Sequence, residues 1–398
     1  MYNRLYSKSQ LLAMEACTGC AACAQVCPAV QVSGDGELSG LYRLDWRQRA
    51  GKTGAGWLRR LFGGKVPDEE AWKTFSETVY RCTLCGNCAE VCPVGIGLKD
   101  IWLNLRQELL EREAYPAKID LIREHLTESH NVFGEDQEER SEWVEDLDEP
   151  PDDLFVKERA EAVYFSGCVA SFFPLAQQIP LALAEVLQSA QVDFTLLGED
   201  EWCCGFPLLS AGDLPGAQAM IQHNLEAVKA RGAKEVIFAC PSCYMMWKEH
   251  YPVGASGLRL SHTTQFLDQL LAQGRLSLDK QEISVTYHDP CDLGRAARIF
   301  EAPRRVIRAL PGVKLVEMAA NREHCLCCGG GGNLEMIDQE LNAGIARMKV
   351  DQVLATGAEA VVSGCQQCLR TMATHARRNK LPLKVMDIAQ LVQASMAG

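Results

Sequence analysis

Apolar residues in the second half of the chain alternate between short runs, typical of buried strands, and longer stretches with helical spacing. From residue 162 onward, the series strand, helix, strand, helix, strand, helix occurs twice. The predicted strands are 162–165, 192–197, 235–239, 283–287, 313–318 and 358–364. The most clearly predicted helices are 180–190, 215–232 and 339–357. This alternation predicts a parallel sheet in each copy.

The first part of the chain has a different pattern. Leucine and isoleucine recur at helical spacing over residues 98–128, which predicts a helix there. The acidic stretch 135–155 contains Pro150 and Pro151, which predicts a linker or a strap over the surface. The predicted organisation is an N-terminal domain (1–128), an acidic linker (129–158), a first module (159–280) and a second module (281–398).

The composition narrows the class of protein. A net charge of -12 excludes nucleic acid as the main partner, because phosphate binding needs a basic face. No apolar run approaches the length of a membrane span, and the N-terminus lacks the pattern of a secretory signal. The 19 cysteines in so long a chain do not fit a secreted disulfide scaffold. We therefore expect a cytoplasmic protein whose cysteines bind metal as thiolates.

Eight cysteines form two closely spaced runs in the N-terminal domain. The runs are Cys17, Cys20, Cys23 and Cys27, then Cys82, Cys85, Cys88 and Cys92. Both fit the bacterial ferredoxin pattern C-x2-C-x2-C-x3-C-P, in which the fourth cysteine ligates the other cluster. We therefore assign Cys92 to the first cluster and Cys27 to the second. A zinc site would use about four ligands in pairs, so we predict two cubane [4Fe–4S] clusters in a largely helical, ferredoxin-like α+β domain.

Ten further cysteines repeat in the two modules. The first module has Cys168, Cys203, Cys204, Cys240 and Cys243, and the second has Cys291, Cys327, Cys328, Cys365 and Cys368. Several of them follow predicted strands, so they should converge at the carboxyl edge of each sheet, where α/β folds bind ligands. Five thiolates exceed what one cubane uses, which favours a larger or split cluster. Gly205, Gly329 and Gly330 follow the paired cysteines and predict close approach of backbone to the cluster or the substrate. The run of four glycines at 329–332 predicts space for a substrate sulfur beside the second module's cluster.

The phrases YHDPCDLGR, CCGGGG and HNVFGE carry a family resemblance. Nearly the whole chain resembles the CCG-domain iron–sulfur family, typified by the catalytic subunit of methanogen heterodisulfide reductase. Related members are cytoplasmic iron–sulfur subunits of bacterial membrane redox complexes. The resemblance implies tandem α/β CCG modules with parallel sheets, each complete module holding a noncubane [4Fe–4S] cluster. With both modules complete, we expect one or two such clusters here.

The resemblance also implies a function and partners. We expect an oxidoreductase subunit that relays electrons between its cubanes and CCG-bound clusters that act on a thiol/disulfide couple. It would lie at the cytoplasmic face of the inner membrane, held by other subunits such as a membrane-embedded cytochrome or a quinone-reactive subunit. The alternatives are an electron conduit for a flavin-dependent glycolate, lactate or glycerol-3-phosphate dehydrogenase, and a structural or sensory iron–sulfur protein.

The chemistry is predicted to occur in the second module, at its five cysteines. His288 and Asp289 either cap a turn or deliver protons to a released thiolate. Arg295 is a candidate partner for an anionic substrate. Cys325 lies outside the five-cysteine pattern and is either a spare buried thiol or a redox-active or alternative ligand. His262, after a strand-like stretch, is predicted to be structural.

One basic, aromatic-containing stretch occurs at 43–65 in this acidic chain. It contains Arg47, Arg59 and Arg60. Two interpretations stay open: a solvated helix and turn, or a docking surface for a membrane subunit or for anionic headgroups.

Overall fold

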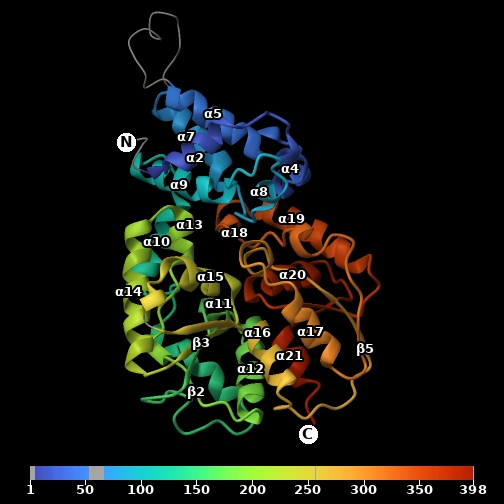
Figure 1. Cartoon of the computed structure of the whole chain (residues 1–398). Coiled ribbons are helices and arrows are strands. Elements are labelled where there is room, and N and C mark those ends of the chain that lie inside the picture. Colours follow the sequence, from blue (N-terminus) through green and yellow to red (C-terminus); the bar gives the residue numbers. More distant parts are fainter. Residues whose placement is uncertain (1–4, 53–66, 256, 398) are drawn as a thin grey trace, which may run out of the picture. The chain divides into compact units, whose positions relative to one another are not determined.

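The computed structural model describes residues 5–52, 67–255 and 257–397 (Figure 1). The chain divides into two compact units. The first unit comprises the described part of Met1–Leu121 with Pro207–Leu214 and Gly329–Ile345. The second comprises Ile122–Phe206, Pro215–Cys328 and the chain from Ala346 onward. Each unit therefore combines segments that are far apart in sequence, and the predicted domain boundaries stay predictions.

The first unit is helical, and no strand occurs among its described residues. Its helices are α2 (Lys8–Glu15), α3 (Ala22–Gln25), α4 (Pro28–Ser33), η1 (Gly36–Leu38), α5 (Gly40–Lys52), α7 (Glu69–Tyr80), α8 (Asn87–Glu90), α9 (Leu98–Glu111) and α18 (Leu334–Ile337). Helices α7 and α9 pack together through buried Phe75, Val79, Leu105 and Leu109. The second cysteine run, from Cys82 to Cys92, lies between the end of α7 and the start of α9.

The prediction of one helix over 98–128 is wrong. Helix α9 ends at Glu111, and a separate helix α10 (Lys118–Glu128) follows. Glu113 adopts a left-handed conformation with φ 56°, and Pro116 lies in the connection. Proline removes a helical hydrogen bond and clashes with the preceding turn, so the apolar spacing continues while the helix does not.

The second unit contains two four-stranded sheets with the same topology. The first consists of β1 (Ala162–Phe165), β2 (Phe194–Thr195), β3 (Glu235–Phe238) and β4 (Arg259–His262), in the order β2-β1-β3-β4. The second consists of β5 (Ile283–Tyr287), β6 (Val313–Leu315), β7 (Ala360–Ser363) and β8 (Lys384–Asp387), in the order β6-β5-β7-β8. All pairs are parallel, which confirms the predicted parallel sheets. Strand β8 was not predicted.

Helices cover these sheets. Those of the first module are α11 (Cys168–Phe172), η3 (Pro174–Ala176), α12 (Gln178–Ser189), η4 (Gly198–Asp200), α14 (Leu214–Ala230), α15 (Pro241–His250), η5 (Val253–Ala255) and α16 (Thr263–Ala272). Helix α13 (Phe206–Ala211) lies almost entirely in the first unit. Those of the second are the π-helix η6 (Asp292–Ala296), α17 (Glu301–Ala309), η7 (Arg322–His324), α19 (Gln339–Leu354), α20 (Gln366–Arg378) and α21 (Ile388–Gln393). The 3-10 helix η2 (Gln137–Asp146) precedes both modules.

One apolar core joins the two modules. Helix α12 of the first module packs against α21 of the second, and α16 packs against α17 (Figure 1). The core includes buried Tyr164, Leu183, Tyr287 and Val362 from both halves. Because each sheet is buried on its faces, the strand ends are the places where polar and sulfur-bearing side chains gather.

Candidate metal centres

The structure brings the fourth cysteine of each ferredoxin-type run to the other run. Cys17, Cys20, Cys23 and Cys92 line one small cavity of the first unit. Cys27 instead lies close enough to Cys82 and Cys85 for these thiols to raise its pKa, after the larger effect of burial. This crossed arrangement supports the ligand assignment made from spacing.

The second run is the more enclosed of the two. Cys85 is buried and Cys88 is half-buried, whereas Cys20 of the first run is exposed. Burial raises the pKa of the Cys88 thiol, and nearby Cys82 and Cys85 raise it further. Thiols this close together keep their protons unless metal binding displaces them, so the set fits an iron–sulfur cluster.

The glycine run after the second cysteine pair packs against this second ferredoxin run. A side chain at Gly331 would come within 2.5 Å of the Thr83 carbonyl oxygen, and one at Gly332 would collide with the backbone of Cys82 and Thr83. Arg106 links these segments by donating to the carbonyls of Cys82 and Gly332, at 2.8 and 2.9 Å. The expectation that these two glycines leave space for a substrate is therefore wrong, because backbone of the first unit fills that space.

The other glycines have local roles. The Asn342 side chain donates to the Gly329 carbonyl at 3.1 Å, while Gly330 continues the run. Gly205 has φ 91°, and a side chain there would come within 3.3 Å of the Ala217 carbonyl oxygen. A positive φ and a close backbone neighbour both require glycine after the first cysteine pair.

All five thiols of the first module form one continuous chain of side-chain contacts. Its order is Cys168, Cys203, Cys204, Cys243 and Cys240. Cys168 follows β1 and Cys240 follows β3, and these strands are neighbours in the sheet. Hydrogen bonds from Cys203 and Cys243 lower the pKa of Cys204 to about 6. Five buried sulfurs in contact fit a multi-iron centre.

The second module gathers its thiols at the corresponding place. Cys328 Sγ lies 3.1 Å from Cys368 Sγ, and Cys368 also contacts Cys365. Cys327 adjoins Cys328 in the chain, and Cys291 directly precedes the π-helix η6. A ring nitrogen of His288 and the Cys328 and Cys368 sulfurs all lie within 4.8 Å of one another.

His288 belongs to a buried cluster with Cys325 and Lys349. Its Nδ1 lies 3.4 Å from Cys325 Sγ, and Lys349 Nζ lies 3.4 Å from the same sulfur. Burial lowers the pKa of His288. Burial raises the pKa of Cys325, but Lys349 and His288 outweigh it and lower that pKa to about 6. Cys325 is therefore no isolated thiol, since it lies between two basic groups beside the second site.

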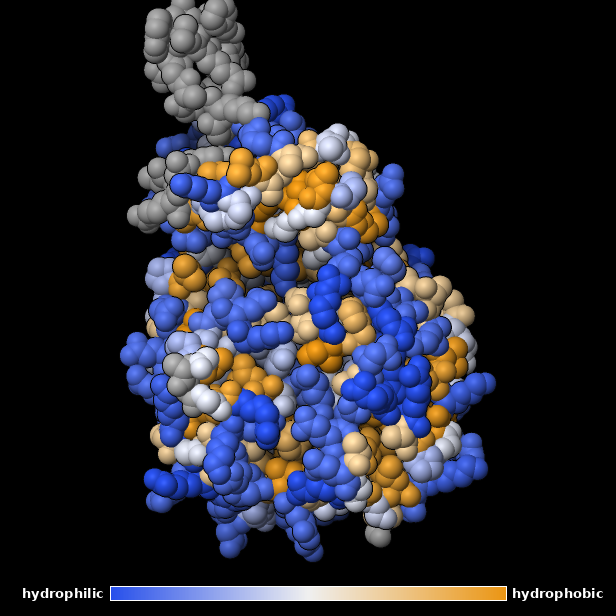
Figure 2. Space-filling model, in the orientation of Figure 1, coloured by the Kyte–Doolittle hydropathy of each residue, from blue (hydrophilic) through white to orange (hydrophobic). Residues whose placement is uncertain are grey.

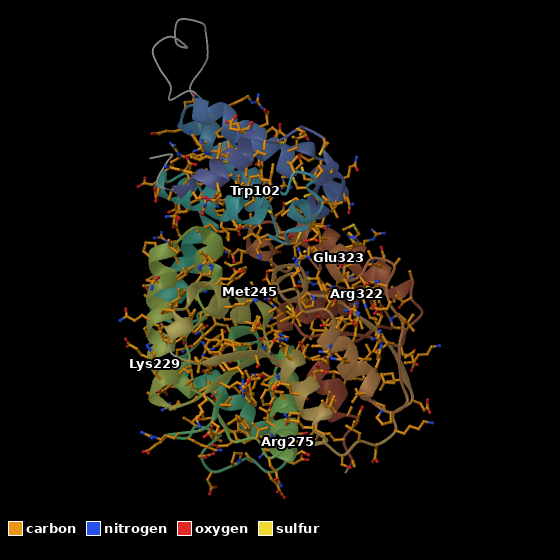
Figure 3. All side chains as sticks on the ribbon, viewed as in Figure 1. Trp102, Lys229, Met245, Arg275, Arg322 and Glu323 are labelled. Carbon is orange, nitrogen blue, oxygen red and sulfur yellow. The ribbon has the colours of Figure 1, made fainter. Side chains whose placement is uncertain are left out.

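Asp289 and Arg295 both form hydrogen bonds with other groups of the chain. Asp289 accepts two hydrogen bonds from buried Arg304, at 2.7 and 2.9 Å, and a third from the Arg322 backbone. Arg295 donates to the carbonyls of Glu323 and Cys325. Arg322 and Glu323, which are labelled in Figure 3, belong to the η7 turn. These contacts favour roles in positioning the cysteine loops over direct contact with substrate.

Two weaker expectations can be compared with the structure. Arg47 is buried and its Nε donates to Glu108 at 2.7 Å, so the prediction that it contributes to a docking surface is wrong. Arg59 and Arg60 lie outside the described residues. His262 is fully buried and caps α16 through its Nδ1, with a capping box completed by Gln265, which fits the structural role predicted for it.

Sequence reasoning missed several polar groups at these sites. Arg140 and Glu201 pair at 2.9 Å beside the first module's thiols. Gln366 of the second module accepts from Ala170 and donates to the Ser166 carbonyl in the first. Closeness to a cysteine in the sequence could have pointed to two of them: Gln366 directly follows Cys365, and Glu201 stands two residues before Cys203.

Family profiles match both parts of the chain. The 4Fe-4S dicluster domain matches residues 13–96, and the cysteine-rich CCG domain matches residues 162–248 and 285–373. Within the part of the chain that the structure covers, no helix is long and apolar enough to cross a bilayer. On the face seen in Figure 2, hydrophobic residues are interspersed with hydrophilic ones.

Curated relatives cover nearly the whole chain. It is 35% identical to one subunit of the dihydromethanophenazine:CoB–CoM heterodisulfide reductase of Methanosarcina mazei, over 97% of this chain and 95% of that one. It is 32% identical to a probable membrane-anchored ferredoxin of Chromohalobacter salexigens, over 98% of this chain and 61% of that one. It is 29% identical to the EtfAB:quinone oxidoreductase of Syntrophomonas wolfei, over 81% of this chain and 47% of that one.

Proposed function

Because the chain belongs to the family of this heterodisulfide reductase subunit, with a 4Fe-4S dicluster domain and two CCG domains, we propose that it relays electrons to or from a thiol/disulfide couple. The relay would run through two cubane clusters held by the ferredoxin-type cysteines and two noncubane clusters held by the modules. The observation that carries this proposal is the continuous contact of all five thiols in the first module.

The arrangement of the first unit supports a path for electrons. Gly332 follows Cys328 by four residues and packs on the backbone of Cys82. The chain that leaves the second module's cysteine pair thus reaches the second ferredoxin-type run. Clusters held at these cysteines supply one-electron redox chemistry, and the protein's part is to fix their spacing and exclude water.

We place the thiol/disulfide chemistry in the second module. His288 lies within 4.8 Å of the Cys328 and Cys368 sulfurs, so an imidazole is close to where a thiolate would be released. His288 stands three residues before Cys291, and the residue at the same place before Cys168 is Phe165, whose side chain has no proton to give. The partners we propose are further subunits of a redox complex at the inner membrane and a disulfide-bearing protein or cofactor.

Iron and sulfide analysis of the anaerobically purified chain tests the cofactor content. We expect about sixteen iron atoms per chain, four at each of four sites. A content near about eight would leave only the two cubanes and refute the proposal for the modules. Cys17→Ser and Cys82→Ser should each interrupt electron delivery from the natural donor while leaving the module signals intact.

A second candidate function is electron conduction without a substrate site, as for a flavin-dependent dehydrogenase of glycolate, lactate or glycerol 3-phosphate. The similarity to a quinone oxidoreductase favours it. Reduction of a small disulfide by the reconstituted chain, with a viologen donor, distinguishes the two. Full iron content without any disulfide turnover would favour the conduit.

A further inference from the structure

The acidic segment before the first module is packed against that module. The helix η2 contacts η4 and α11, and its Trp143 and Val144 are buried. Upstream, the backbone N–H of Cys203 donates to the His130 carbonyl at 2.8 Å. Asn131 closes the turn that follows, with its side chain bound to backbone groups of Phe133 and Glu135. The segment therefore contributes side chains to the site of the first module.

Arg140 is the side chain that this segment inserts. It is 1% exposed. One terminal nitrogen donates to Glu201 at 2.9 Å, and the other donates to Gln137 at 3.0 Å and lies 3.9 Å from Cys168 Sγ. Its Nε finds no acceptor among the described residues. A buried guanidinium with an unused N–H beside five thiols points to a further acceptor at the site, such as a sulfide or thiolate sulfur.

Glu201 connects the same guanidinium to the backbone that carries Cys168. Its carboxylate accepts hydrogen bonds from the backbone N–H groups of Ser166 and Gly167, both at 2.8 Å. Arg140 thus holds the Cys168 loop twice, once through Glu201 and once at the sulfur. Arginine keeps its charge in proteins, so this positive charge is permanent.

The contact between Arg140 and Cys168 affects the charge balance of the first module's site. Thiolate ligands make a buried iron–sulfur centre anionic, and reduction adds a further negative charge that water cannot screen there. A nearby cation and an N–H···S hydrogen bond both stabilise the reduced form, and such contacts set the potentials of iron–sulfur centres.

We infer that Arg140 is a positioning residue of the first module, which raises the reduction potential of the iron–sulfur centre held by Cys168 and its neighbours. The inference rests on the proposed function, because it requires that the first module holds such a centre. The acidic segment is then a functional part of the site, with the guanidinium supplied from outside the cysteine repeat.

Redox titration of the full chain, followed by electron paramagnetic resonance, tests the inference. Arg140→Met should shift the first module's reduction equilibrium at least tenfold toward the oxidised form, which equals about 59 mV for a one-electron couple. Arg140→Lys keeps the charge and should recover at least half of that shift. Glu201→Gln leaves the guanidinium uncompensated and should shift the potential in the opposite direction.

Lys234→Met is the matched control. Lys234 belongs to the same module, and its exposed ammonium pairs with Glu161, which directly precedes β1 at the amino end of the sheet. This variant should leave the potential unchanged. Iron analysis and thermal melting accompany each variant, and Glu201→Gln decides the matter if Arg140→Met loses its iron.

The inference is overturned if Arg140→Met retains iron and titrates as the unmodified chain does, or if Glu201→Gln shifts the potential in the same direction as Arg140→Met. Its failure is distinguishable from failure of the proposed function. An unmodified chain with iron at only two sites refutes the proposed function, whereas a fully loaded chain with unaltered potentials refutes the role of Arg140 alone.

Discussion

The two modules share one framework and differ in the charged groups around it. Their sheets have the same strand order, and their cysteines follow corresponding strands. Two residues before each cysteine pair, however, the first module has Glu201 and the second has Cys325. Glu201 pairs with Arg140, whereas Cys325 contacts Lys349 and His288. Each module thus places an acidic group beside a buried cation, but only the second uses a thiol.

The same contrast occurs at the fourth strands. His262 ends β4 and Asp387 ends β8, and each caps the following helix with a capping box. Burial lowers the pKa of His262 to about 3 and raises that of Asp387 to about 7. The comparison teaches that the repeat preserves the cysteine positions and the sheet, while the neighbouring polar residues make the two sites chemically different.

The largest expected effect separates the modules by function. Cys328→Ser should reduce thiol/disulfide turnover more than about 100-fold, since loss of even an outer-shell partner costs about 10–100-fold. The matched variant Cys204→Ser should leave turnover measurable with an artificial donor, because it removes a relay ligand. Reduction of a small disulfide, with iron content measured in parallel, checks both. Activity lost in Cys204→Ser and kept in Cys328→Ser would place the chemistry in the first module.

The second expected effect concerns the buried ion pair that anchors the second module's first cysteine loop. Arg304→Met leaves the Asp289 carboxylate buried without its two charged hydrogen bonds. Breaking such a pair from one side costs about 3–5 kcal/mol of unfolding free energy. Urea unfolding measures the loss.

The neighbouring Arg305→Met is its control. Arg305 pairs with Asp268 at a largely exposed position, and such surface pairs contribute under about 1 kcal/mol. Equal losses in the two variants would show that the Asp289–Arg304 pair does not stabilise the second module.

The third prediction concerns Asp387, which ends β8, in contrast to His262, which ends β4. Burial raises the pKa of Asp387 from 3.8 in the unfolded chain to about 7 in the folded chain. Stability from this group is therefore present at low pH and is lost as the pH rises toward 7. A pKa change of one corresponds to about 1.36 kcal/mol, so the loss of unfolding free energy is at most about 4 kcal/mol. We expect a loss of about half that size. Asp387→Asn keeps the helix cap and should remove this loss.

Urea unfolding at pH 5 and pH 8 measures that difference. The Asn variant should gain more stability over the unmodified chain at pH 8 than at pH 5, because about two of the roughly three pH units between the two pKa values lie above pH 5. His262→Asn is the control from the first module: burial lowers the pKa of His262 from 6.5 to about 3, so at pH 8 its ring is neutral in both the folded and the unfolded chain and adds no loss there. A gain at pH 8 in His262→Asn as large as that in Asp387→Asn would contradict the assignment to Asp387.

Periodicity and cysteine spacing predicted the parallel sheets, because strands and motifs are local properties of the chain. Crossed pairing of the ferredoxin-type runs was also predictable, since the spacing itself implies it. The break between α9 and α10 was missed because apolar spacing persists on both sides of Pro116. The prediction followed the apolar spacing and gave too little weight to Pro116 as a residue that ends helices.

The charged groups at the sites could not be predicted for a different reason. Arg140 and Lys349 reach the cysteines through tertiary packing, and Glu201, although two residues before Cys203, meets the Cys168 loop and Arg140 only in the folded chain. Arg140 lies in the acidic segment, where an arginine suggests solvent contact, yet it is 1% exposed. Burial of a charge depends on partners distant in sequence, so a single sequence carries no signal of it.

The smallest expected effect concerns Cys325, where the two modules differ most in chemistry. Cys325→Ala removes one of the three side-chain contacts of buried Lys349, which retains Gln352 Oε1 at 2.8 Å and Met318 Sδ at 3.0 Å. The cost should be about 1 kcal/mol, the net contribution of one hydrogen bond, because Lys349 keeps two other partners. Iron content should stay that of the unmodified chain, whereas Cys327→Ala should lower it. Iron analysis with urea unfolding measures both, and iron lost equally in the two variants would make Cys325 a sixth ligand of the second module.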